Sequence, residues 1–215
     1  MKKRKRYTRK EEFFNGITHG LGVLFGIGVL ITLLVNSSKH GNLLSMVAFS
    51  IYSACLIIMY LSSTLYHGIT NGRIKKILRV FDHSSIYLFI AGSYTPMALL
   101  TLRGGLRIGI MIAIWSIAIL GVIFKIVTIG DFDRYKAISL IMYIGMGWLA
   151  LFTIKPVIRM TSIRFLFWIL AGGLAYSVGT IFYSIKRIPY NHAIWHIFVL
   201  GGTILHFIGI FLYLV

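Results

Sequence analysis

Charged residues are scarce in this sequence of 215 residues. Lys, Arg, Asp and Glu together make up 13% of the chain, against about 25% in an average soluble domain. Only five residues are acidic, whereas 58% of the chain is hydrophobic and the mean hydropathy is +0.85. These values exclude a disordered chain, a coiled coil and a collagen-like protein, because each of those classes has a more polar or more repetitive composition. The composition is that of an integral membrane protein.

Cysteine and proline are also rare. The single cysteine, Cys55, has no partner for an internal disulfide and lies in an apolar run, so we expect a small buried side chain there. The three prolines are isolated, and no proline-rich linker divides the chain. We therefore predict two parts only: a basic cytoplasmic N-terminal segment (1–12) and a transmembrane domain (13–215).

Seven long stretches of the sequence contain no Lys, Arg, Asp or Glu. Each is long enough to cross a hydrocarbon core about 30 Å thick as one helix, which needs ~17–25 residues. A membrane β-barrel would need polar and apolar residues to alternate, and the run from Phe165 to Leu170 does not alternate. The prediction is an all-α integral membrane protein, a bundle of seven transmembrane helices. The stretches are 13–38, 40–72, 83–102, 108–124, 137–154, 165–185 and 188–215.

The basic residues between these stretches predict the orientation. If the N-terminus is cytoplasmic, 16 of them lie on the cytoplasmic side and 6 on the outside. Because cytoplasmic loops are enriched in Lys and Arg, we predict a cytoplasmic N-terminus and an outside C-terminus in a multi-pass protein of the cell (plasma) membrane. The net charge of +17 comes with no nucleic-acid-binding motif. The predicted partners are therefore anionic lipid headgroups at the cytoplasmic face, and not nucleic acid.

Three histidines are predicted to meet at the cytoplasmic ends of their helices. His192 and His196 are spaced i, i+4 at the start of the seventh stretch, so both rings project from one helix face and can hold one metal ion. His67, near the end of the second helix, is the best third ligand by depth. Three histidines with an open fourth position are typical of catalytic zinc. The alternative is that each histidine only hydrogen-bonds to a neighbouring helix.

Other histidines are less well placed for this site. His19 enters with the first helix at a similar depth, and His40 is placed in the first external loop. His206 follows His196 in the same helix and lies ~15 Å deeper, at 1.5 Å per residue.

Asp82 is the acid that stands directly beside a membrane span. It could cap the N-terminus of the third helix, or it could act as a base or orienting group for metal-bound water. Ser63 lies four residues before His67 on the same helix face, where it could bond to the water or to a developing oxyanion, or back to the carbonyl of Met59. For the other acids, solvated pairing with basic neighbours is sufficient; they are Glu11, Glu12, Asp131 and Asp133.

Taken in order, these motifs resemble a known family. They are Glu12-x-x-Asn15-x-x-Thr18-His19, Ser63-x-x-x-His67, Asp82, and Pro189-x-x-His192-x-x-x-His196 with His206. Over essentially its whole length the chain is similar to the hemolysin III branch of the progestin and adipoQ receptor family, and its small size resembles the bacterial members. The resemblance implies a seven-helix bundle with a zinc ion near the cytoplasmic leaflet. It also implies the ligands His67, His192 and His196, with Ser63 and Asp82 near the metal-bound water.

Three functions are left open by the sequence. The first is a zinc-dependent hydrolase of a lipid amide or ester, by analogy with the related alkaline ceramidases. The second is a cytolytic or channel-like protein, although the spans lack the repeated polar stripe of a pore. The third is a zinc-stabilised sensor without chemistry, which predicts a closed fourth coordination position. The sequence carries no signal for an oligomeric state.

Overall fold

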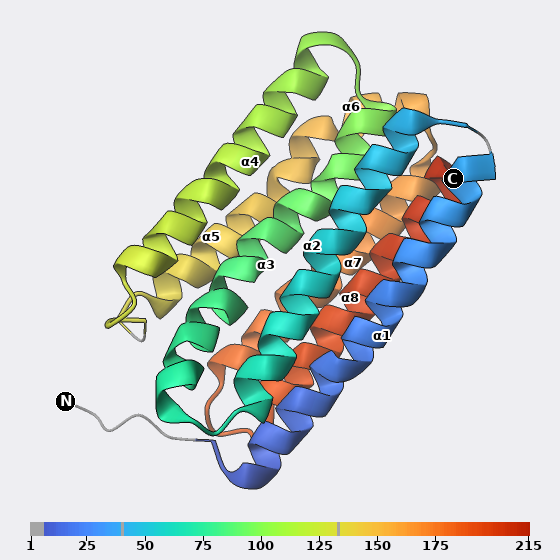
Figure 1. Ribbon diagram of the computed structural model, residues 1–215. Helices are drawn as coiled ribbons and strands as arrows, with labels where there is room; N and C mark the ends of the chain where they lie inside the picture. The colour runs from blue at the N-terminus through green and yellow to red at the C-terminus, as the bar shows by residue number, and fades with distance from the viewer. Residues whose placement is uncertain (1–6, 40, 133) are drawn as a thin grey trace.

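The protein is a bundle of long helices that run side by side (Figure 1). The computed structural model describes residues 7–39, 41–132 and 134–215. The predictions made for His40, Asp133 and the basic residues at positions 2–6 lie outside these residues. Within the described residues no strand occurs, so the all-helical prediction is confirmed. The elements are α1 (Arg9–Lys39), α2 (Leu43–Gly68), α3 (Gly72–Thr101), α4 (Gly104–Val127), α5 (Lys136–Trp148), the 3₁₀ helix η1 (Leu149–Thr153), α6 (Ile154–Met160), α7 (Ile163–Ser184) and α8 (Asn191–Leu214).

Six helical rods are long and apolar enough to cross a membrane. One of them is the continuous run Lys136–Met160, which consists of α5, η1 and α6. Helix α3 is of similar length but is not among the six, because its sequence mixes polar residues with apolar ones. The chain is therefore a multi-pass membrane protein, while the seventh span and the orientation stay predictions.

The outer face of the bundle is apolar. Large side chains such as Ile112, Phe152 and Phe167 are more than half exposed on different helices. A soluble monomer rarely shows such a continuous apolar surface, whereas helices in a bilayer present one to the lipid chains. The distribution of side chains thus agrees with the composition.

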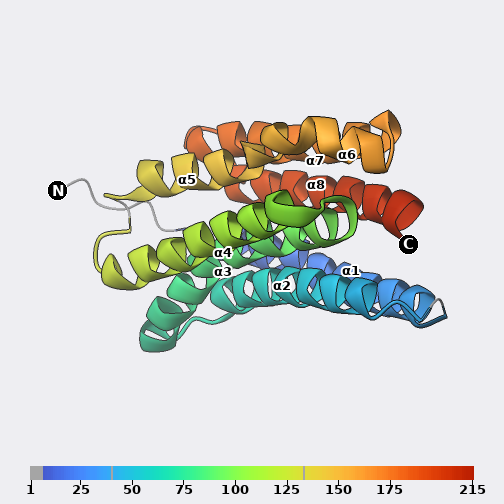
Figure 2. The same ribbon diagram turned by 90° about the horizontal axis from the view of Figure 1, so that it is seen from above.

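The helices form two groups with α8 between them. Seen from above, α1 to α4 lie on one side and α5 to α7 on the other (Figure 2). Helix α8 packs against both α1 and α7. Residues at the start of α8 can therefore meet residues of α1 and α2, which are far away in sequence.

One end of the bundle collects the residues of interest. Helix α1 begins there at Arg9, α2 ends there at Gly68 and α8 begins there at Asn191, whereas the chain ends at the opposite end (Figure 1). We call it the histidine end. The start of α1 is set by a capping box, in which the Thr8 hydroxyl accepts from the Glu11 amide and the Glu11 carboxylate accepts from the Thr8 amide.

Close packing of α1 on α2 depends on glycine. A Cβ atom added at Gly22 would lie 2.3 Å from a ring carbon of Tyr60, and one at Gly26 would lie 2.4 Å from a methyl carbon of Leu56. Only residues without a side chain allow this approach. It brings the first turns of α1 to within contact of His67 at the end of α2.

The rod that begins with α5 changes to a 3₁₀ helix near its middle. The Tyr94 hydroxyl of α3 accepts from the amide of Ala150 and lies within 2.7–2.9 Å of the carbonyl oxygens of Gly147 and Met146. These contacts satisfy backbone groups that the change of helix type leaves free. Cys55 of α2 is buried and meets Gly92 of α3, which confirms the small buried side chain expected there.

A candidate metal centre

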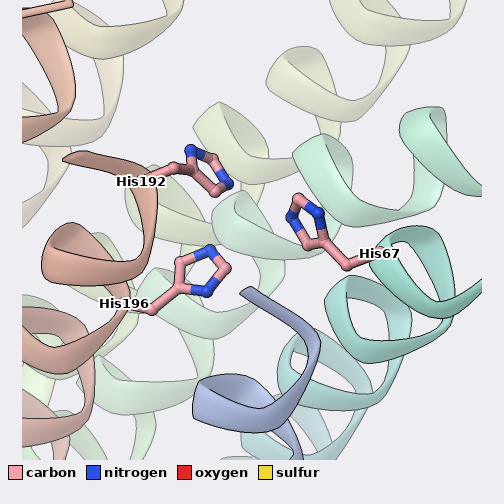
Figure 3. Close-up of side chains that lie close together, drawn as sticks. All are labelled: His67, His192 and His196. Atoms are coloured by element: carbon pink, nitrogen blue, oxygen red, sulfur yellow. The ribbon is translucent and has the colours of Figure 1, made fainter. Parts of the chain in front are cut away.

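Three histidines from two helices converge at the histidine end (Figure 3). His67 comes from the last turn of α2, and His192 and His196 come from the first turns of α8. One ring nitrogen of each lies within 4.8 Å of the others, and the residues are 3%, 6% and 0% exposed respectively. The structure therefore brings together the three residues that the sequence predicted as ligands.

The outward-facing nitrogens of two of these rings are held by α1. The Nδ1 atom of His67 lies 2.6 Å from Oε2 of Glu12, and Nδ1 of His196 lies 3.1 Å from both the Asn15 carbonyl oxygen and the Thr18 hydroxyl. Carboxylates and carbonyls only accept, so both Nδ1 atoms carry the proton. Each Nε2 atom is then left with a lone pair.

Those lone pairs face the centre of the trio. Among the described residues, Nε2 of His67, Nε2 of His196 and both ring nitrogens of His192 are buried and have no hydrogen-bond partner. Buried polar atoms are rarely left unpaired, and a ligated histidine typically donates its other N–H to a carboxylate or a carbonyl. Nitrogens bound to a tetrahedral zinc are ~3.4 Å apart, so small side-chain rotations would bring the trio to bonding distance. The residues present fit a metal ion, and neutral imidazoles suit zinc.

The role of α1 was missed from the sequence. Glu12 was expected to be solvated, but its carboxylate joins His67 to Lys75, whose Nζ atom lies 3.0 Å from Oε1 of Glu12. The expected pairing with a basic residue is present at Lys75, but the contact with His67 was not expected. The available signal was the spacing of Glu12, Asn15 and Thr18, which places all three near one face of a helix. Their partners could be found only from the packing of α1.

Asp82 does not cap the third helix. Helix α3 begins at Gly72, and its N-cap is Asn71, whose side chain accepts from two backbone amides. Asp82 lies more than two turns inside the helix and is 8% exposed. The capping alternative is therefore wrong. The Asp82 carboxylate lies 3.2 Å from Nδ1 of His83 and also near His67.

Ser63 lies close to the Asp82 side chain and is 1% exposed. The sequence left open a bond from Ser63 to the Met59 carbonyl. In the structure that carbonyl accepts from the neighbouring Ser62. Ser63 therefore lies beside Asp82, one helical turn before His67.

Two other histidines occupy different surroundings. His19 stacks on His196, with ring centroids 3.4 Å apart. It does not belong to the group of three histidines whose ring nitrogens lie within 4.8 Å of one another. His206 lies deeper in the bundle, where its Nε2 atom donates to the Ile169 carbonyl at 3.0 Å. The structure thus separates His206 from the trio.

An apolar cavity of about 140 Å³ adjoins these residues. It lies between α3, the α5–α6 rod, α7 and α8, and most of its wall is hydrophobic. Asp82 and His19 line it, and so does the deeper His206. Asp82 therefore borders the cavity and also lies near His67.

Comparison with known proteins identifies the family of this chain. The chain matches the family model described as "Haemolysin-III related" over residues 7–207, which include every site residue described above. The chain belongs to the haemolysin III family. The resemblance predicted from the sequence motifs is thereby confirmed.

Curated relatives of this haemolysin III chain include bacterial and human proteins. It is 45% identical to "Hemolysin-3" of Bacillus cereus over 95% of this chain and 92% of that protein. It is 43% identical to "Hemolysin-3 homolog" of Bacillus subtilis (strain 168) over 97% of each chain. It is 31% identical to the human "Monocyte to macrophage differentiation factor" over 76% of this chain and 69% of that protein.

We expect Glu12→Ala to lower zinc affinity by about 10–100-fold, because the variant removes the carboxylate that fixes the His67 ring and its tautomer. Competition of the purified protein with a chromogenic chelator measures the affinity. Glu11→Ala is the matched control: it removes the same charge one residue earlier, and among the described residues the Glu11 carboxylate accepts from the Thr8 amide, away from His67. Equal affinities for the two variants would contradict the orienting role of Glu12.

Proposed function

We propose that this protein is a zinc-dependent hydrolase that cleaves an amide or ester bond of a membrane lipid. The observation that carries the proposal is the position of Asp82, a buried carboxylate that lines the apolar cavity and lies near the histidine trio. A metal site that served only stability would need neither a carboxylate at its edge nor a cavity beside it. Catalytic metal sites combine both with an open coordination position.

Each group has a role in this proposal. A zinc ion held by the three imidazoles would polarise a lipid carbonyl and make water a nucleophile at neutral pH. Asp82 would accept a proton from the attacking water and return it to the leaving amine or alkoxide. Ser63 would donate a hydrogen bond to the carbonyl oxygen as negative charge develops on it. The cavity would hold an acyl chain and exclude bulk water.

Mass spectrometry of lipid products tests this function. The detergent-purified protein is incubated with ceramide and with phospholipids, first after metal removal and then with zinc restored. We expect free fatty acid to appear only in the zinc-restored sample. If zinc-loaded protein releases no fatty acid from either lipid class, the hydrolase proposal is wrong and the trio serves another purpose.

A cytolytic activity is the second candidate, and the name of the Bacillus cereus relative supports it. Cleavage of membrane lipids would itself damage a membrane, so one active site can account for both activities. In that case, a variant that no longer releases fatty acid also no longer lyses erythrocytes. Lysis that persists in such a variant would favour a separate cytolytic mechanism.

We propose that the histidine end faces the cytoplasm. With this orientation, 16 basic residues lie on the cytoplasmic side and 6 on the outside, in agreement with the enrichment of Lys and Arg in cytoplasmic loops. With Cys55 replaced by alanine, single cysteines are introduced at two exposed positions, Lys76 near the start of α3 and Arg159 in α6. A membrane-impermeant thiol reagent on intact cells should label position 159 and leave position 76 protected. The reverse pattern would place the candidate metal centre at the outer leaflet.

A further inference from the structure

His206 lies in the wall of the apolar cavity, deep in the bundle and away from the histidine trio. Helix α8, which carries it, is one of the six helices long and apolar enough to cross a membrane. A polar side chain at such a depth is costly, and it usually faces another polar group, water or a ligand. His206 has no part in the candidate metal centre or in the proposed hydrolysis. An aliphatic residue would suit this wall better, so the imidazole points to a polar partner.

One edge of the His206 ring is fixed against α7. The Nε2 atom donates to the Ile169 carbonyl, and a Cβ atom added at Gly172 would lie against Cδ2 and Nε2 of the ring. Because Nε2 carries the proton, Nδ1 carries a lone pair. Nδ1 is the ring atom opposite the Cδ2–Nε2 edge, so it faces away from α7. Among the described residues no hydrogen bond reaches Nδ1, which leaves its lone pair available to a ligand in the cavity.

The side-chain hydroxyls of the cavity wall already have partners within the protein. Most of them donate to a backbone carbonyl, and that of Tyr176 bonds to the hydroxyl of Thr203. A buried acceptor left without a donor is costly, so a donor for His206 has to come with the ligand. The wall hydroxyls belong to Ser93, Tyr94, Tyr143, Tyr176, Ser177 and Thr180.

We propose that His206 selects an acyl chain that carries a hydroxyl group near its middle, and that Nδ1 accepts a hydrogen bond from this hydroxyl. The inference rests on the proposed function, because it takes the cavity as the place of the acyl chain. A hydroxyl is a small, uncharged donor, which suits a wall that is otherwise mostly hydrophobic. The bond would form only with a chain that is hydroxylated at the right depth.

The dimensions of the cavity fit such a chain. The cavity follows α3 from Asp82 to Met97, a rise of ~22 Å at 1.5 Å per residue. One water-sized group needs about 10–15 Å³ of a cavity, so 140 Å³ holds about ten groups of the size of a methylene. His206 lies ~15 Å beyond His196, which corresponds to about twelve carbon–carbon bonds of an extended chain. The hydroxyl is therefore expected near the twelfth carbon from the metal centre.

Binding of free fatty acids to the full-length protein in detergent tests this inference without any hydrolysis. Displacement of radiolabelled stearic acid gives the relative affinities. The probe is 12-hydroxystearic acid, and it is compared with stearic acid and with 2-hydroxystearic acid, whose hydroxyl lies beside the carboxyl group. We expect 12-hydroxystearic acid to bind about 3–10-fold more tightly than either of the others, which is the usual net effect of one hydrogen bond.

Two variants show whether His206 causes this preference. His206→Leu should remove it, because leucine fills a similar space and offers no acceptor. Phe211→Leu is the matched control: it lies on the same helix, is 39% exposed and is not part of the cavity wall, so the preference should remain. If His206→Leu does not fold, the comparison of the three acids on the wild type decides alone.

Equal affinities of the three acids for the wild type, or an unchanged preference in His206→Leu, would overturn the proposal. Absence of binding by every acid would overturn it too, because the cavity then holds no acyl chain. The outcome is separate from that of the hydrolase test. A preference for 12-hydroxystearic acid without lipid hydrolysis supports the role of His206 and refutes the hydrolase, whereas hydrolysis with equal affinities does the reverse.

Discussion

The purified His192→Ala, His196→Ala double variant should contain essentially no zinc, whereas the wild type should contain about one zinc ion per chain. Both rings belong to one face of α8, and their removal leaves only His67 of the three nitrogens that gather at the centre. A single imidazole binds zinc too weakly to retain it through purification, because structural and catalytic sites use three or four protein ligands. Elemental analysis of washed, detergent-purified protein measures the content.

The matched control for this variant is His206→Ala, which removes another histidine of α8. Its ring bonds to the Ile169 carbonyl and lies away from the trio, so this variant should keep its zinc. Far-ultraviolet circular dichroism of all three proteins checks that the helices remain. Wild-type zinc content in the double variant would show that the metal, if present, is bound elsewhere.

The helices of this protein could be predicted well because the membrane imposes a simple rule. A stretch without charge must be helical inside a bilayer, since only a helix satisfies its own backbone there. The rule locates the part of a helix that is in lipid and not the end of the helix. Helix α3 shows the difference, because it begins at Gly72 and carries Arg73 and Lys76 in its first turns, well before the uncharged stretch that starts at His83.

That difference explains the error at Asp82. An acid directly before an uncharged stretch looks like an N-cap, but α3 begins ten residues earlier, at Gly72, and Asn71 caps it. The first turns of α3 are helical although they are charged, and Arg73 and Lys76 in them are exposed. Helix boundaries in such segments depend on capping residues and not on hydropathy.

The histidine trio could be predicted for a similar reason, whereas its supporting contacts could not. The i, i+4 spacing fixes two rings on one face, and the topology brings His67 to the same end of the bundle. The bonds from α1 join residues that are 55 and 181 positions apart in the chain. They depend on the close approach that Gly22 and Gly26 allow, which spacing within one helix does not reveal.

Asp82→Asn should lower lipid hydrolysis by about 10²–10⁴-fold while zinc content and fold are retained. Asparagine has nearly the same size and shape as aspartate, so it fits the buried position of Asp82 beside the cavity. Its amide cannot take up a proton at neutral pH, and the variant therefore removes the base without opening a hole. The initial rate of fatty acid release, measured together with zinc content and melting temperature, gives the result.

Two controls separate this effect from charge and from helix capping. Asp131→Asn removes a carboxylate from an exposed loop position, so its rate should equal that of the wild type. Asn71→Ala removes the side chain that caps α3 and should lower the melting temperature by a few degrees without a comparable loss of rate. Full activity of Asp82→Asn with zinc retained would mean that this carboxylate moves no proton. Loss of zinc together with the fold would instead make Asp82 part of the structure, because a proton acceptor can be removed without unfolding the helix that carries it.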